Sequence, residues 1–165
     1  MFKNPDKAPK SYTPGEALPK IAAYCAYQER THKEVAEKLK SYGLDEDEAG
    51  EIIIRLGREK LLDEERYAQS YARGKHRTNG WGRRRIKLEM KAKGLSDYCI
   101  KSGLKELDGD EYYAKLKQLL GQRDAREKET HPMKRKMKLM AYLIQKGYES
   151  DLIQEALGEL ASGEE

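Results

Sequence analysis

The sequence repeats one pattern around three glycines, Gly43, Gly94 and Gly147, which lie 51 and 53 residues apart. When the glycines are superposed, apolar residues coincide eight and four residues before the glycine and one, six, ten and thirteen residues after it. The aligned sets are Val35, Ile86 and Leu139; Leu39, Met90 and Leu143; Leu44, Leu95 and Tyr148; Ala49, Ile100 and Ile153; Ile53, Leu104 and Leu157; and Leu56, Leu107 and Leu160. A period of about 50 residues indicates an array of equivalent structural units.

The spacing within each copy predicts a pair of helices joined at the glycine. Positions eight and four before the glycine share one face of a helix, the glycine ends that helix in a left-handed conformation, and the later positions form one face of the next helix. A further helical segment precedes each pair, at residues 18–27, 64–75 and 112–122. We therefore expect an all-α fold, an elongated, curved tandem array of three three-helix repeats.

The expected repeats are residues 17–62, 63–109 and 110–161. Residues 1–16 contain three of the five prolines and few apolar residues, so we expect a disordered tail there and a short one at 162–165. The isoleucines at 52–54 favour a buried helix over a strand, given the acidic residues that precede them. The glycines at 80 and 82 predict a loop over residues 78–82.

Side chains at several boundaries predict helix caps. Thr31 and Glu34 have the spacing of a capping box, and Asp45 and Ser96 follow their glycines as N-caps. The acidic residues Asp108, Asp110 and Glu111 favour a linker turn between the second and third repeats.

Composition excludes several classes of protein. Apolar and charged residues each make up 38% of the chain, and the mean hydropathy is −0.97. No run approaches the length of a membrane span and no apolar stretch resembles a secretory signal, so we expect a cytosolic protein. Cys25 and Cys99 are too few for a disulfide framework and are expected to be reduced helix residues.

The positive charge is concentrated in the second repeat. The net charge is +4, but residues 73–93 hold nine cations and one acid, so this segment carries +8 and the rest of the chain −4. A shorter basic run follows at residues 134–138, and acids gather at 45–51. Such a patch suits a phosphate backbone or an acidic protein surface, whereas the alternative is a solubilising face.

The helix expected from Arg83 carries this charge on a defined face. Ile86 and Met90 mark its core side, while Arg84, Lys87 and Lys91 share another side. Cations at 83–85 oppose the helix dipole at its N-terminus, which favours a contact surface. Trp81, in the preceding loop, either plugs the gap between helices or stacks on a base or a partner side chain.

Motifs for catalysis and metal binding are absent from the sequence. No phosphate-binding loop occurs, the three histidines are scattered, and neither HExxH nor paired CxxC spacing exists. The acidic segment beginning at Asp45 has Ala49 and Leu56 where a calcium loop needs oxygen ligands. We therefore expect a protein that is not an enzyme and uses no cofactor or metal.

Residues 18–160 resemble the RecX family of bacterial regulatory proteins. In the second repeat, Asp63 followed by Arg66-Tyr67-Ala68, and Gly82-x-x-Arg85-Ile86-x-x-Glu89-Met90 before Gly94, are similar to the family signature. In the first repeat, the stretch from Arg30 through Glu34-Val35 and Leu39 to Gly43 is also similar. The third repeat keeps Leu139, Leu143 and Gly147 but has no clear family sequence in its first helix.

The resemblance implies a non-enzymatic, monomeric regulator of homologous recombination and DNA repair in the SOS response to DNA damage. Such a protein lies in the groove of the RecA–DNA filament, on single- or double-stranded DNA, and inhibits ATP hydrolysis, strand exchange and filament growth. The central contact would use Arg73, Lys75, Arg77, Trp81, Arg83, Arg84, Arg85, Lys87 and Lys91. A second contact would use Lys134, Arg135, Lys136 and Lys138. The alternatives are an autonomous DNA-binding helical repeat and a helical adaptor for an acidic protein.

Overall fold

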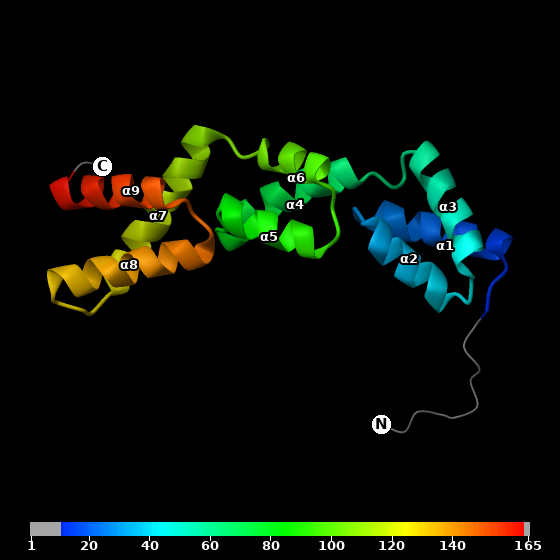
Figure 1. The fold of residues 1–165 in the computed structure, drawn as a ribbon, viewed down its shortest axis with the longest axis horizontal. Helices are drawn as coiled ribbons and strands as arrows, with labels where there is room; N and C mark the ends of the chain where they lie inside the picture. The colour runs from blue at the N-terminus through cyan, green and yellow to red at the C-terminus, as the bar shows by residue number, and fades with distance from the viewer. Residues whose placement is uncertain (1–10, 164–165) are drawn as a thin grey trace, which may run out of the picture. The chain divides into compact units, whose positions relative to one another are not determined.

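The structure, a computed structural model, describes residues 11–163, and every regular element in that range is an α-helix (Figure 1). The helices are α1 (Pro14–Tyr27), α2 (His32–Ser41), α3 (Glu46–Arg58), α4 (Glu64–Asn79), α5 (Arg83–Ala92), α6 (Asp97–Leu104), α7 (Gly109–Arg126), α8 (Pro132–Lys146) and α9 (Ser150–Ser162). The predicted all-α fold with three helices to a repeat is confirmed. The elongated, curved form and the exact repeat boundaries stay predictions.

The chain divides into two compact units, one ending at Tyr67 and one beginning at Ala68. In the first unit, α1, α2 and α3 pack on one another around one apolar core. The core residues are Ala17, Ile21, Cys25, Val35, Leu39, Leu44, Ala49, Ile52, Leu56 and Leu62. Both caps predicted in this unit are confirmed, since Thr31 and Asp45 each form a complete capping box. The isoleucine run is helical, as predicted, with Ile52 buried.

The N-terminal tail predicted for residues 1–16 is too long. Residues 1–10 lie outside the described part of the chain, but Tyr12 donates its backbone N–H to the carbonyl of Tyr42 at 2.9 Å, and the two rings pack edge to face. Thr13 then caps α1 by accepting from the backbone of Glu16, and Pro14 begins the helix. A proline at the first helical position is favourable because its missing N–H would have no partner there.

The second unit contains the end of α4 and the helices α5 to α9 (Figure 1). Helix α5 packs on α6, and α7, α8 and α9 pack on one another. The residues aligned on the three glycines are largely buried in both units, but Leu160 is 39% exposed, so its assignment to the core is wrong. The chain after Leu56 folds back on it through the N–H groups of Leu61 and Leu62, whereas α9 ends two residues after Leu160.

The three repeat glycines adopt the predicted left-handed conformation, with φ of +84° at Gly43, +80° at Gly94 and +101° at Gly147. Two loop predictions are wrong. Helix α4 continues to Asn79 and ends at Gly80, whose φ is +68°, so the loop is shorter than residues 78–82. The acidic residues from Asp108 form the start of α7, where the Asp108 carboxylate accepts from the two following acidic residues' backbone N–H groups.

Candidate functional site

Arg83, the first residue of α5, is held by the third repeat. Its guanidinium Nη1 lies 2.7 Å from Glu149 Oε2, and its Cζ lies 3.7 Å from the centre of the Tyr112 ring. Its backbone N–H donates to the Tyr112 hydroxyl at 3.0 Å, and that hydroxyl in turn donates to Glu149. A cation with this many partners positions one repeat against the next rather than offering a free charge to a ligand.

Backbone hydrogen bonds extend this junction on both sides of Arg83. The N–H of Gly82 donates to the carbonyl of Lys146 at 2.8 Å, and that of Arg84 donates to Gly147 at 3.0 Å. The Tyr148 hydroxyl donates to the carbonyl of Gly80 at 3.0 Å. We call residues 80–84, the end of α8 and the side chains between them the repeat 2–3 junction.

Two glycines allow this close approach of backbones. A Cβ on Gly82 would overlap the backbone of Gly147. A Cβ on Gly147 would overlap Arg85, and the positive φ of Gly147 disfavours a side chain independently. The junction therefore depends on the absence of two methyl groups.

His76 is a buried titratable group in the same junction, 7% exposed. Its ring stacks on Tyr112 with 5.2 Å between centroids, and its Nδ1–H donates to the carbonyl of Trp81 at 3.0 Å. Burial lowers the pKa of His76, the hydrogen bond to Trp81 raises it, and the nearby cations Lys115 and Arg83 lower it. The neutral imidazole is the form that the folded protein favours.

We expect the protein to lose stability as the pH falls from about 6.5 toward 5. The pKa of His76 is lower in the folded state than the value of about 6.5 in an unfolded chain, so the unfolded state binds more protons in that window. Melting temperatures measured between pH 5 and 8 should fall less steeply with acid in His76→Gln than in the wild type. The control, His131→Asn, removes an exposed imidazole and should keep the wild-type slope. Equal slopes in all three proteins would contradict the prediction.

Trp81 is partly exposed and lies beneath two cations. Lys75 Nζ lies 5.1 Å and Arg85 Cζ 4.2 Å from the centre of its ring. Because Arg83 pairs with Glu149 and Arg85 lies over Trp81, two of the three arginines that begin α5 have partners within the protein. The inference that all three cations serve an external contact is therefore wrong, and only Arg84 remains exposed.

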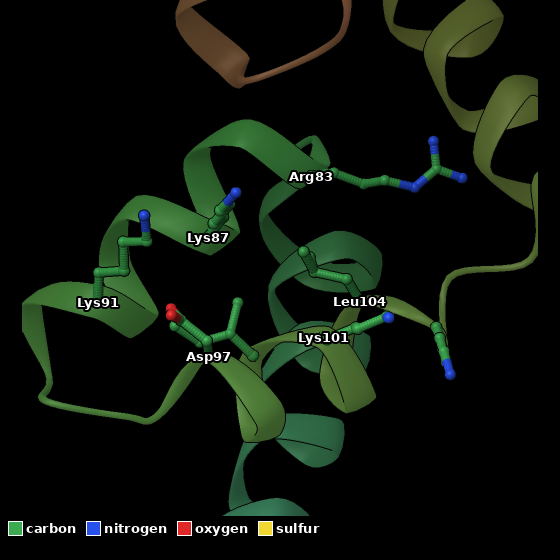
Figure 2. A pocket seen from close by; sticks show the side chains of 8 residues that line it. Arg83, Lys87, Lys91, Asp97, Lys101 and Leu104 are labelled. Atoms are coloured by element: carbon green, nitrogen blue, oxygen red, sulfur yellow. The ribbon is translucent and has the colours of Figure 1, made fainter.

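The cations without ion pairs in residues 11–163 gather between α5 and α6. Lys87 and Lys91 on α5 face Lys101 and Lys105 on α6 across an open groove of about 530 Å³. Figure 2 shows the side chain of Arg83 extending away from Lys87 and Lys91. The complete lining is Arg83, Lys87, Lys91, Asp97, Ile100, Lys101, Leu104 and Lys105. We call this feature the cationic groove; its five cations and one acid make it suited to a polyanion.

Lys101 and Lys105 were missed by the sequence reasoning, because the basic segment was taken to end at Lys93. Their four-residue spacing, which places both on one side of α6, was the available signal. Of the other predicted contacts, Arg73 pairs with Glu106 at 3.2 Å, and Arg77 is exposed.

The predicted second contact, at residues 134–138, also divides into held and exposed cations. Arg135 pairs with Asp124 at 2.8 Å and donates to two carbonyls in the preceding loop. Lys138 lies 3.5 Å from Glu129 and 3.8 Å from Glu127. Lys134 and Lys136 are exposed and form no ion pair within residues 11–163.

Neither metal nor membrane features accompany these surfaces in the part of the chain that the structure describes. No group of three or more His, Cys, Asp or Glu side chains in residues 11–163 is arranged to hold a metal ion. In the same residues, no helix combines the length and the apolar character that crossing a bilayer requires.

The fold and the cationic groove together define a tandem three-helix repeat protein with a polyanion-binding surface in its second repeat. Family models described as the first, second and third three-helix domains of RecX match residues 20–56, 63–104 and 110–157. The chain belongs to the RecX family of regulatory proteins.

Individual relatives and solved structures agree with this assignment. The chain is 31% identical over 138 residues to the regulatory protein RecX of Mycobacterium sp. (strain KMS), covering 79% of this chain and 75% of the relative. It is 28% identical over 143 residues to that of Oceanobacillus iheyensis, covering 86% of this chain but only 52% of the relative, so it spans about half the length of that protein. The crystal structure of RecX from Lactobacillus salivarius superposes with a TM-score of 0.83 at 29% identity, covering 90% of this chain and 96% of the other.

Proposed function

We propose that this protein binds the RecA filament on DNA and inhibits its ATP hydrolysis, strand exchange and growth, without catalysing a reaction itself. Membership of the RecX family supports a recombinase as the partner. The cationic groove is the observation that carries the proposal, because it offers several unpaired cations to a phosphate backbone within one open surface. The proposed regulator acts in the cytoplasm as a monomer.

The proposed contact surface is narrower than the basic segment of the sequence. It comprises the exposed cations of α5 and α6 and the aromatic ring beside them, whereas Arg73 and Arg83 position the helices. Its residues are Arg84, Lys87, Lys91, Lys101 and Lys105, with Arg77, Lys75 and Trp81 at its edge.

The double variant Lys87→Glu/Lys91→Glu tests this surface. In a titration of RecA ATP hydrolysis on single-stranded DNA, its half-inhibiting concentration should rise by about tenfold or more, because two attractions to phosphate become repulsions. The wild-type effect should also weaken as salt is raised. The matched control, Lys33→Glu/Lys40→Glu, makes the same charge change on exposed positions of α2 and should inhibit like the wild type. Unchanged inhibition by the groove variant, or equal loss in both variants, would refute the assignment.

The two other functions give different results in the same experiment. An autonomous DNA-binding repeat would bind naked DNA with strong salt dependence and leave RecA ATP hydrolysis unaffected. An adaptor for an acidic protein would show no DNA affinity at moderate salt.

A further inference from the structure

Helix α8 has an apolar face that no other part of the described chain covers. Its buried side, marked by Leu139 and Leu143, packs against α7 and α9. On another side, Met133, Met137 and Ile144 are 60%, 64% and 47% exposed. Their spacing of four and seven residues places them on one line along the helix at 100° per residue. Met140, partly exposed, lies on the same line.

This line of side chains differs from an isolated exposed apolar residue. It extends about 16 Å along the helix, at 1.5 Å per residue from Met133 to Ile144. Single exposed apolar residues are common on soluble proteins, whereas contiguous ones mark interaction sites. Methionine adapts its unbranched chain to different apolar partners, which suits a docking face. We call these four residues the methionine stripe.

The charges beside the stripe select among partners. Residues 132–146 contain no Asp or Glu, and the exposed Lys134 and Lys136 lie on opposite sides of the stripe at 100° per residue. Arg135 and Lys138, by contrast, pair with acids of the preceding segment. The available surface is thus apolar along its centre and cationic along both edges.

We propose that the methionine stripe binds an acidic amphipathic helix of a partner protein. Apolar side chains of such a helix, spaced by three or four residues, cover the methionines, while its carboxylates meet Lys134 and Lys136. Phosphate contacts alone have no use for a line of methionines, so the stripe is a protein contact separate from the cationic groove on α5 and α6.

A synthetic peptide serves as the probe, a helix with leucines on one side and glutamates beside them. A peptide of the same composition in scrambled order keeps the charge and loses the apolar side. With the full chain labelled at methionine methyl groups, the amphipathic peptide should shift the signals of Met133 and Met137 and leave that of Met90, buried in α5, in place. The variant Met133→Gln/Met137→Gln should weaken binding by about tenfold or more, since burial of even one methionine is worth over a factor of ten.

The control variant is Ile54→Gln, which removes an exposed apolar side chain from α3 and should bind the peptide like the wild type. Four results would each overturn the proposal: no binding of the amphipathic peptide, equal binding of the scrambled peptide, displacement of the peptide by a DNA duplex that shifts the same methyl signals, or a wild-type dimer that the methionine variant separates. Failure of the proposed function would be distinguishable, since this experiment contains no recombinase.

Discussion

Replacing Gly82 with alanine is expected to lower the free energy of unfolding of the second unit by about 3 kcal/mol. The added methyl group would overlap the backbone of Gly147, and backbone cannot move aside as the end of a flexible side chain can. Relief of the overlap would separate the 80–84 segment from α8 and stretch the hydrogen bonds from Gly82 to Lys146 and from Arg84 to Gly147. The expected fall in melting temperature is about 6–12 °C for a chain of this size.

Gly74→Ala provides the control, because Gly74 lies inside α4 with no atom near the position of its added Cβ. That substitution should raise stability by about 0.5–1 kcal/mol, since alanine favours the helix. Urea unfolding of both variants, followed by far-ultraviolet circular dichroism, measures the difference. A Gly82→Ala variant as stable as the wild type would mean that the repeat 2–3 junction is looser in solution than the structure shows.

Arg83→Glu is expected to destabilise the protein by about 2–4 kcal/mol, whereas Lys87→Glu, one turn along the same helix, should change stability by less than about 0.5 kcal/mol. The first substitution places a carboxylate against Glu149 and removes the cation over the Tyr112 ring. The second changes an exposed residue of the cationic groove.

The exchanged pair Arg83→Glu/Glu149→Arg separates the ion pair from the rest of the junction. It should recover about 1 kcal/mol or more of the loss, measured as the coupling in a double-mutant cycle of urea unfolding. Additive losses would show that the pair contributes nothing beyond its separate side chains. A loss of RecA inhibition in Arg83→Glu alone would then report a disturbed repeat rather than a lost DNA contact.

Local sequence signals predicted the repeats well. The capping boxes at Thr31 and Asp45 and the left-handed glycines each depend on residues within one turn or one helix end, so their chemistry is visible in a short stretch of sequence. The extent of α7 was missed because its start depends on Asp108 acting as an N-cap, a residue whose acidic neighbours equally suit a turn.

Long-range contacts were outside the reach of the same reasoning. The basic segment showed that Arg83 is charged, but its partner Glu149 lies 66 residues further along the chain, in a different repeat. Tyr112, which joins the two, was assigned only to a helix. The argument from the helix dipole therefore treated all three arginines of α5 alike, although the structure places two of them against Glu149 and Trp81.

The glycine column that defines the repeats has three different surroundings. A side chain at Gly43 would meet Ser11, one at Gly94 would enter open space, and one at Gly147 would collide with Arg85. All three glycines turn the backbone in the same way, but only Gly147 also receives the preceding repeat. A designed array that copied one averaged repeat end to end would reproduce every turn and still lack the lock that fixes one copy onto the next.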